Sequence, residues 1–209
     1  MTRLWQIGDS PSTLQLNEIA KSLAGGAVVL MPTDTIYGLH ALALHEQAVE
    51  RVADIKGREE TKPFIVLAAS MDHLKLLGIS ADPEVLDALA SLWPAPLTAI
   101  LPLEAPIPAS RGALTLAVRI PALDWLRELV ARTGPLVSTS ANRSGEPSVE
   151  SPVSLARDLQ DRLDAIVDGG VRDGKASTIV DLTSAEPHFL REGEHSFTQK
   201  VWKTLRKTL

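Results

Sequence analysis

The 209-residue sequence contains no cysteine, few aromatic residues and no long apolar run. The absence of cysteine excludes disulfides, thiolate metal ligands and a cysteine nucleophile, and it fits a reducing compartment. Because aromatic residues make up only 4% of the chain, we expect a core of Leu, Val, Ile and Ala. No stretch of about 18 apolar residues occurs, and residues 1–6 lack a signal-peptide pattern. We therefore expect no membrane contact and a cytoplasmic location.

The formal net charge is -5, whereas proteins that bind along a nucleic acid backbone are usually basic. Broad nucleic-acid binding is therefore disfavoured, although a local basic cleft is compatible with an acidic whole. With 44% apolar and 22% charged residues, the composition is that of a globular protein. Since no repeat, low-complexity segment or linker is visible, we expect one domain over residues 1–209.

Hydrophobic periodicity predicts both helices and strands. Helical spacing covers residues 14–23, 46–55, 82–93, 121–132, 153–163 and a tail from 197. Short apolar runs predict strands over 27–31, 64–69, 97–101, 114–120, 136–140, 165–167, 178–182 and 188–190. Strands alternate with helices early in the chain, whereas the last strands follow one another directly. This order predicts an α/β fold with a mixed parallel and antiparallel twisted sheet and flanking helices.

Polar clusters follow three of the predicted strands, at residues 33–35, 140–142 and 168–170. In α/β sheets, ligands bind outside the strand ends, where loops reach inward from a rigid scaffold. Each cluster alone is equally well explained as an ordinary turn rich in Ser, Thr, Asn, Asp and Gly. Together, however, the clusters favour a shared binding cleft.

Three cations bracket the end of the second predicted helix, with Lys56 and Arg58 beside Gly57 and Lys62 in the following loop. Cations at this position also complement the helix dipole, which is the simpler explanation. A polyphosphate, however, requires a forked guanidinium together with ammonium groups. Arg119 and Arg191 close two later strands, where they need either an anion or a carboxylate of the chain itself.

Seven short motifs follow one another along residues 15–195. They are Pro32 to Leu39, Lys56 to Arg58, Trp93 to Thr98, Val118 to Pro121, Ser140 to Asn142, Ser177 to Asp181 and Arg191 to Gly193. Together they resemble the YrdC family of threonylcarbamoyl-AMP synthases. Each motif is weak alone, but the ordered set is specific. The resemblance implies an α/β sheet of the YrdC/RibB-like type, curved around a deep and positively lined cavity.

The resemblance also implies a nucleotidyltransferase that makes L-threonylcarbamoyladenylate and pyrophosphate from ATP, L-threonine and bicarbonate. ATP would be bound, with its magnesium ion, by Lys56, Arg58, Lys62, Thr115, Ser140, Asn142, Ser148 and Arg191. Threonine would be bound by Thr35, Arg119, Ser138 and Ser177. Catalysis would fall to Lys56, Arg58, Ser140 and Asn142, with no metal fixed by protein side chains. The product would pass to the machinery that forms N6-threonylcarbamoyladenosine in tRNA.

Two departures from longer family members indicate the short, single-domain (TsaC-type) branch. Leu67 stands where some longer members carry a histidine near the amino acid. Those members also have a second C-terminal domain, for which 209 residues leave no room. We expect instead a YrdC-like core over about residues 15–195 and a short C-terminal helix over about 197–209.

Two alternatives remain open on the sequence. One is an RNA-binding or ribosome-maturation factor, for which Lys200 to Lys207 could form a local basic patch and bind RNA weakly. The other is a paralogue on the same fold that uses another carbamoyl or nucleotidyl acceptor. Threonine-dependent turnover of ATP would distinguish the synthase from both.

Overall fold

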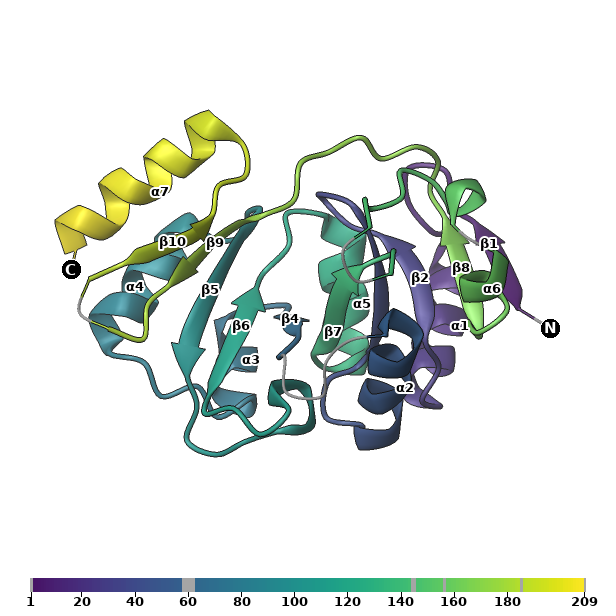
Figure 1. Ribbon diagram of the computed structural model, residues 1–209, viewed down its shortest axis with the longest axis horizontal. Helices are drawn as coiled ribbons and strands as arrows, with labels where there is room; N and C mark the ends of the chain where they lie inside the picture. Colours follow the sequence, from purple (N-terminus) through teal and green to yellow (C-terminus); the bar gives the residue numbers. More distant parts are fainter. Residues whose placement is uncertain (1, 58–62, 144–145, 156, 185, 209) are drawn as a thin grey trace.

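Ten strands of the described residues form one sheet in the computed structural model, which describes residues 2–57, 63–143, 146–155, 157–184 and 186–208 (Figure 1). The strands are β1 (Arg3–Gln6), β2 (Val29–Pro32), β3 (Tyr37–Leu42), β4 (Ile65–Leu67), β5 (Leu97–Pro102), β6 (Thr115–Arg119), β7 (Leu136–Ser140), β8 (Ala165–Asp168), β9 (Thr178–Asp181) and β10 (His188–Arg191). Their order across the sheet is β1-β8-β2-β3-β7-β4-β6-β5-β9-β10. Four neighbouring pairs, β1 with β8, β2 with β8, β4 with β6 and β5 with β9, are parallel, and the others are antiparallel. The predicted mixed sheet is confirmed.

Helices flank the sheet, as predicted. They are α1 (Thr13–Ala24), α2 (Glu46–Lys56), α3 (Met71–Leu76), α4 (Pro83–Leu92), α5 (Asp124–Thr133), α6 (Arg157–Gln160) and α7 (His195–Thr208), with 3-10 turns η1 (Pro108–Ser110) and η2 (Pro152–Ser154). Their boundaries follow local signals. Ser12 and Gln15 form a capping box at the start of α1, and Gly57 ends α2 in the left-handed conformation.

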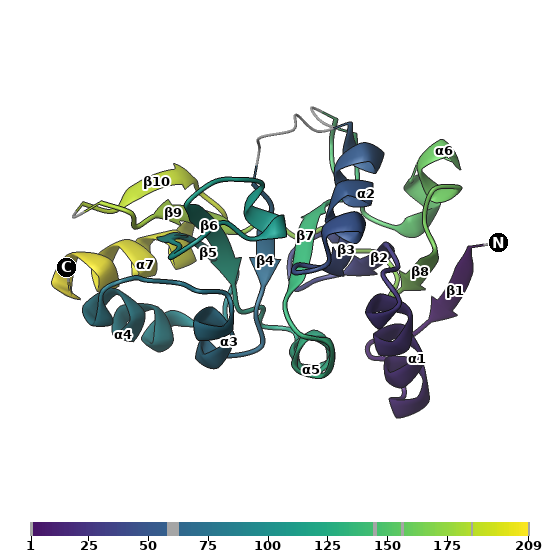
Figure 2. The same cartoon turned by 90° about the horizontal axis from the view of Figure 1, so that it is seen from below.

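Alternation along the strands divides the apolar residues into two buried clusters. In β7, Val137 belongs to a cluster with α2 and α4, whereas Leu136 belongs to a cluster with α1 and α5. Ser138 and Ser140, on the same side as Leu136, line a cavity instead. Although α2 and α4 share one cluster, they lie above and below the strands in Figure 2, as a strong twist of the sheet requires.

The connection over residues 169–177, here called the strap, runs from β8 to β9 past the ends of the central strands, at the top of the sheet in Figure 1. Seven strand-to-strand steps separate β8 from β9, roughly 34 Å on a flat sheet, and ten residue steps of extended chain reach about 33–36 Å. The strap is therefore nearly taut unless the sheet curves. A Cβ at Gly174 would lie 2.3 Å from Thr35 O, so the close crossing over the 33–35 turn requires glycine.

Two parts of the sequence prediction need correction. The helix predicted over 153–163 is wrong, because η2 ends with Leu155 in an extended conformation and α6 is only one turn long. Gln160 Nε2 donates to the backbone oxygens of Pro152 and Leu155, which replaces helical bonds there. The strands β1 and β3 and the helix α3 were not predicted. None of the described helices has the length and apolar character needed to cross a bilayer.

Candidate functional site

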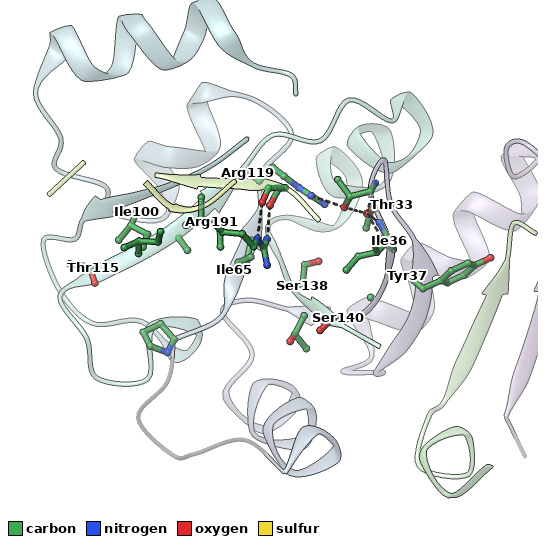
Figure 3. Close-up of a pocket in the computed structure, with 18 residues that line it drawn as sticks. Thr33, Ile36, Tyr37, Ile65, Ile100, Thr115, Arg119, Ser138, Ser140 and Arg191 are labelled. Carbon is green, nitrogen blue, oxygen red and sulfur yellow. Dashed lines mark hydrogen bonds between the residues drawn. The ribbon is translucent and has the colours of Figure 1, made fainter. Parts of the chain in front are cut away.

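A cavity of about 480 Å³ lies over the sheet, and its wall takes residues from β3 to β7, β9, β10 and the strap. Figure 3 shows Arg119 and Arg191 between one end that contains Thr33 and an opposite end that contains Ile100 and Thr115. The two guanidinium groups are thus surrounded by hydroxyl groups on one side and by a largely apolar surface on the other. Such a cavity suits a ligand that carries negative charge.

Arg119, the last residue of β6, has a buried guanidinium that is 5% exposed. Its Nη1 donates to Thr35 Oγ1 (2.9 Å), and its Nη2 lies 3.3 Å from Asp34 Oδ1. Asp34 Oδ2 accepts from the backbone N–H of Ala122 (2.9 Å), which fixes the carboxylate. Burial lowers the pKa of Arg119, while Asp34 opposes that shift. Since Arg119 Nε has no hydrogen-bond partner among the described residues, the guanidinium can still receive an anion.

Arg191, the last residue of β10, approaches the same cavity from the edge of the sheet. Its Nε donates to Ser177 O (2.8 Å) and its Nη2 to Ser177 Oγ (3.1 Å), and Thr98 Oγ1 lies 2.8 Å from the same hydroxyl. Burial lowers the pKa of Arg191, and repulsion from Arg119 lowers it further. An anion bound between the two guanidinium groups would relieve that repulsion.

A buried histidine stands behind the hydroxyl of Ser138. His40 Nε2 lies 3.1 Å from Ser138 Oγ, and the imidazole is fully buried in β3. Burial, with a further contribution from Arg119, lowers the pKa of His40 to about 3. His40 is therefore neutral near pH 7 and adds no positive charge to the cavity. A Cβ at Gly38 would lie 2.9 Å from His40 Cε1, so this packing depends on glycine.

The turn at residues 140–142 follows β7 and is joined to the end of α2. Lys56 Nζ donates to backbone and side-chain oxygens of Ser140 and Asn142, and Ser140 Oγ donates to Asn142 Oδ1 (2.6 Å). Ser140 lines the cavity, whereas Lys56 and Asn142, 4% and 9% exposed, lie behind it. The hydroxyl end of the cavity is thus supported by a lysine that is itself buried.

Apolar side chains make up much of the other end of the cavity. Ile65, Ile100, Ile179 and Leu190 come from four different strands and line the wall beside Thr115. An aromatic ring or another apolar group would remove this surface from water. The whole cavity therefore suits a molecule, or a pair of molecules, that combines anionic groups with an apolar ring.

A sequence profile of the Sua5/YciO/YrdC family, described as "Telomere recombination", matches residues 21–193. The chain belongs to the Sua5/YciO/YrdC family. A relative from Pyrococcus abyssi named threonylcarbamoyl-AMP synthase is 40% identical over 173 residues, 80% of this chain and 51% of that protein. A relative of the same name from Pseudomonas aeruginosa is 35% identical over 171 residues, 80% of this chain and 92% of that protein. The predicted family is confirmed.

Solved structures of the Sua5/YciO/YrdC family share the fold. The crystal structure of P. abyssi Sua5 complexed with L-threonine has a TM-score of 0.87 and 34% identity, over 96% of this chain and 61% of that one. The crystal structure of Escherichia coli YciO has a TM-score of 0.82 and 25% identity, over 92% and 96% of the two chains. This chain spans about half the length of its P. abyssi and Bacillus subtilis relatives, at 51% and 53%.

The cavity gathers seven of the predicted site residues of the family. Its wall includes Thr35, Thr115, Arg119, Ser138, Ser140, Ser177 and Arg191. Lys56 and Asn142 lie behind Ser140, and Ser148 is exposed and outside the wall. Arg58 and Lys62 lie outside the described residues. The roles of all these residues in ligand binding, and the depth of the cavity, stay predictions.

The sequence patterns gave no role to three residues of the site. Asp34 and Thr98 stood inside quoted motifs, while His40 carried no signal, because only tertiary contacts place the three beside Arg119, Ser177 and Ser138. Leu67, where longer family members carry a histidine, is fully buried in the cluster with Trp125 and does not line the cavity.

The buried His40 predicts a loss of stability in acid. In the unfolded chain, His40 binds a proton with its ordinary pKa of 6.5, whereas in the folded protein its pKa is about 3. The unfolded state therefore holds more protons between these values, and the free energy of unfolding falls by up to about 1.4 kcal/mol per pH unit as pH decreases from 6.5 toward 3. His40→Gln should flatten this slope in urea titrations, whereas the exposed His188→Gln should keep it. Equal slopes in both variants would contradict a neutral buried His40.

Proposed function

We propose that the chain is an L-threonylcarbamoyladenylate synthase, a nucleotidyltransferase that combines ATP, L-threonine and bicarbonate and releases pyrophosphate. The observation that carries the proposal is the buried guanidinium of Arg119, whose Nε has no hydrogen-bond partner in the part of the chain that the structure describes, set beside hydroxyl groups in the cavity. The names of the relatives and the threonine complex of a homologue support the same activity. A cytoplasmic location and transfer of the product to the tRNA-modifying machinery belong to the same proposal.

Threonine would bind at the end of the cavity that contains Arg119. A carboxylate pairs well with a guanidinium, and the unpartnered Nε of Arg119 supports such a pair. The hydroxyl groups of Thr35, Ser138 and Ser177 would bind the remaining polar atoms of the amino acid. Because Asp34 holds Arg119 from behind, the guanidinium needs little rearrangement when the substrate arrives.

ATP would occupy the opposite end and extend toward the turn at residues 140–142. The apolar wall beside Thr115 suits the adenine ring, and Arg191 would meet the phosphates. Arg58, Lys62 and Ser148 would complete the phosphate contacts together with Ser140 and Asn142. Magnesium would enter with ATP and neutralise charge on its phosphates.

The proposed chemistry has two steps. The amine of threonine first combines with bicarbonate, with loss of water, to form a carbamate. A carbamate oxygen then attacks the α-phosphorus of ATP, the bond from that phosphorus to the bridging oxygen breaks, and pyrophosphate leaves. Negative charge grows on the departing oxygens, so fixed cations and the alignment of three small reactants would supply most of the acceleration.

Substitution Arg119→Lys tests the threonine end of the cavity. Lysine keeps the charge but cannot form the forked contact, and a lost charged hydrogen bond corresponds to a rise of about 10- to 100-fold in the KM for L-threonine. The KM for MgATP should change less than about threefold, because the phosphates bind elsewhere. Steady-state pyrophosphate release measures both, with the exposed Arg3→Lys as the matched control. An unchanged KM for threonine in Arg119→Lys would remove Arg119 from the threonine site.

Omission of single reactants tests the proposed reaction itself. Pyrophosphate release should require MgATP, L-threonine and bicarbonate together, because the carbamate must form before the nucleotide is attacked. The measurement is a coupled pyrophosphate assay with each component left out in turn. Release that continues without threonine or without bicarbonate would contradict the proposal and would favour another acceptor.

A further inference from the structure

Oxygen atoms of Ser140 and Asn142 lie around the ammonium group of Lys56. Lys56 ends α2, is 4% exposed and does not line the cavity. Its Nζ lies 2.7 Å from Ser140 O, 2.7 Å from Asn142 O and 2.5 Å from Asn142 Oδ1, with Ser140 Oγ at 3.2 Å. Four oxygens of the 140–142 turn therefore face one positive charge.

These distances account for the hydrogen-bonding capacity of the lysine. An ammonium group has three N–H bonds, and the contacts with Ser140 O, Asn142 O and Asn142 Oδ1 are short enough to use one each. A phosphate oxygen that bound Lys56 would have to displace one of them. That exchange is unfavourable, because a buried oxygen left without a donor lowers the stability of the protein by about 1–3 kcal/mol.

The bonds also orient the groups that reach the cavity. Asn142 Oδ1 accepts from Lys56 Nζ and from Ser140 Oγ, so one amide oxygen joins the lysine to the hydroxyl of a cavity residue. The other end of the same amide donates to Glu146 O. Asn142 is thereby fixed from both sides, and Ser140 is fixed through it.

We propose that Lys56 is a positioning residue, whose ammonium clamps the Ser140–Asn142 turn, and that it does not itself bind the phosphates of the nucleotide. The clamp is a property of the free protein and requires no substrate. It gives the buried charge its compensating partners, as burial demands. Only its kinetic consequence rests on the proposed function.

Stability of the ligand-free protein distinguishes a clamp from a phosphate ligand. Lys56→Met removes the ammonium, keeps most of the stem and takes one donor each from Ser140 O, Asn142 O and Asn142 Oδ1, so the Tm of the free protein should fall by about 10 °C. The exposed lysine variant Lys75→Met should leave the Tm unchanged. The opposite result is expected if Lys56 binds the phosphates of a substrate. Removal of a charge that waits for a substrate would leave the free protein equally stable or more stable. An unchanged or raised Tm in Lys56→Met would overturn the proposal.

A kinetic split separates positioning from general loosening of the fold. In Lys56→Met, kcat for pyrophosphate release should fall about 10- to 100-fold, because the reacting phosphate is misaligned. The KM for L-threonine should stay within about twofold, since Arg119 bonds to Thr35 whereas Lys56 bonds to the Ser140–Asn142 turn. Equal damage to both quantities would indicate loosening and would overturn the proposal. If the wild-type protein releases no pyrophosphate, the proposed function fails, while the Tm result still decides the clamp.

Lysine ammonium NMR provides a measurement on the unaltered protein, should Lys56→Met fail to fold. An ammonium held by three buried oxygens exchanges slowly with water, so Lys56 should give a protected 15N signal in the free protein. The signal should persist unshifted when MgATP is added. A missing signal in the free protein, or a signal that appears or couples to phosphorus only with MgATP, would overturn the clamp.

Discussion

The buried guanidinium of Arg119 sets the conditions that the rest of the site has to meet. A charge at the end of a central strand needs an opposite charge, and Asp34 provides it only because the 33–35 turn lies beside β6. The strap crosses that turn closely enough to require Gly174, and it delivers Ser177 into the cavity wall. The same charge contributes to the low pKa of both His40 and Arg191. A bound anion would reduce this repulsion between positive charges.

Much of the fold could be predicted because its elements carry local signals. Helices α1, α2 and α4 and most of the strands follow from periodicity, capping residues and apolar runs. Strand β3 was missed because Gly38 and His40 are poor strand residues, and only their packing against one another and β7 explains them. The helix predicted over 153–163 failed for a local reason, since the side chain of Gln160, in the same segment, bonds to the backbone oxygens of Pro152 and Leu155. The assignment of residues 1–209 to one domain stays a prediction.

The site could be predicted as far as the motifs reached. Thr35, Arg119 and Ser138 line one cavity although they are distant in sequence, because β6 and β7 both pair with β4. What the motifs could not supply was the distinction between residues that face the cavity and residues that support it. Lys56 stands in the same motif as Arg58, yet burial turns its charge toward the 140–142 turn. Burial and direction depend on tertiary packing, so a motif alone cannot separate contact from support.

In the proposed reaction, one cavity joins threonine, bicarbonate and the α-phosphate of ATP in a single product. The most direct measurement is 31P and 13C NMR of the product formed from MgATP, L-threonine and 13C-labelled bicarbonate. We expect a nucleotide in which the labelled carbonyl carbon is bonded to the nitrogen of threonine. The same carbon should show 13C–31P coupling through the oxygen that links it to the α-phosphorus. A nucleotide product without the labelled carbon, or labelled carbon that never becomes linked to phosphorus, would exclude the proposed synthase reaction.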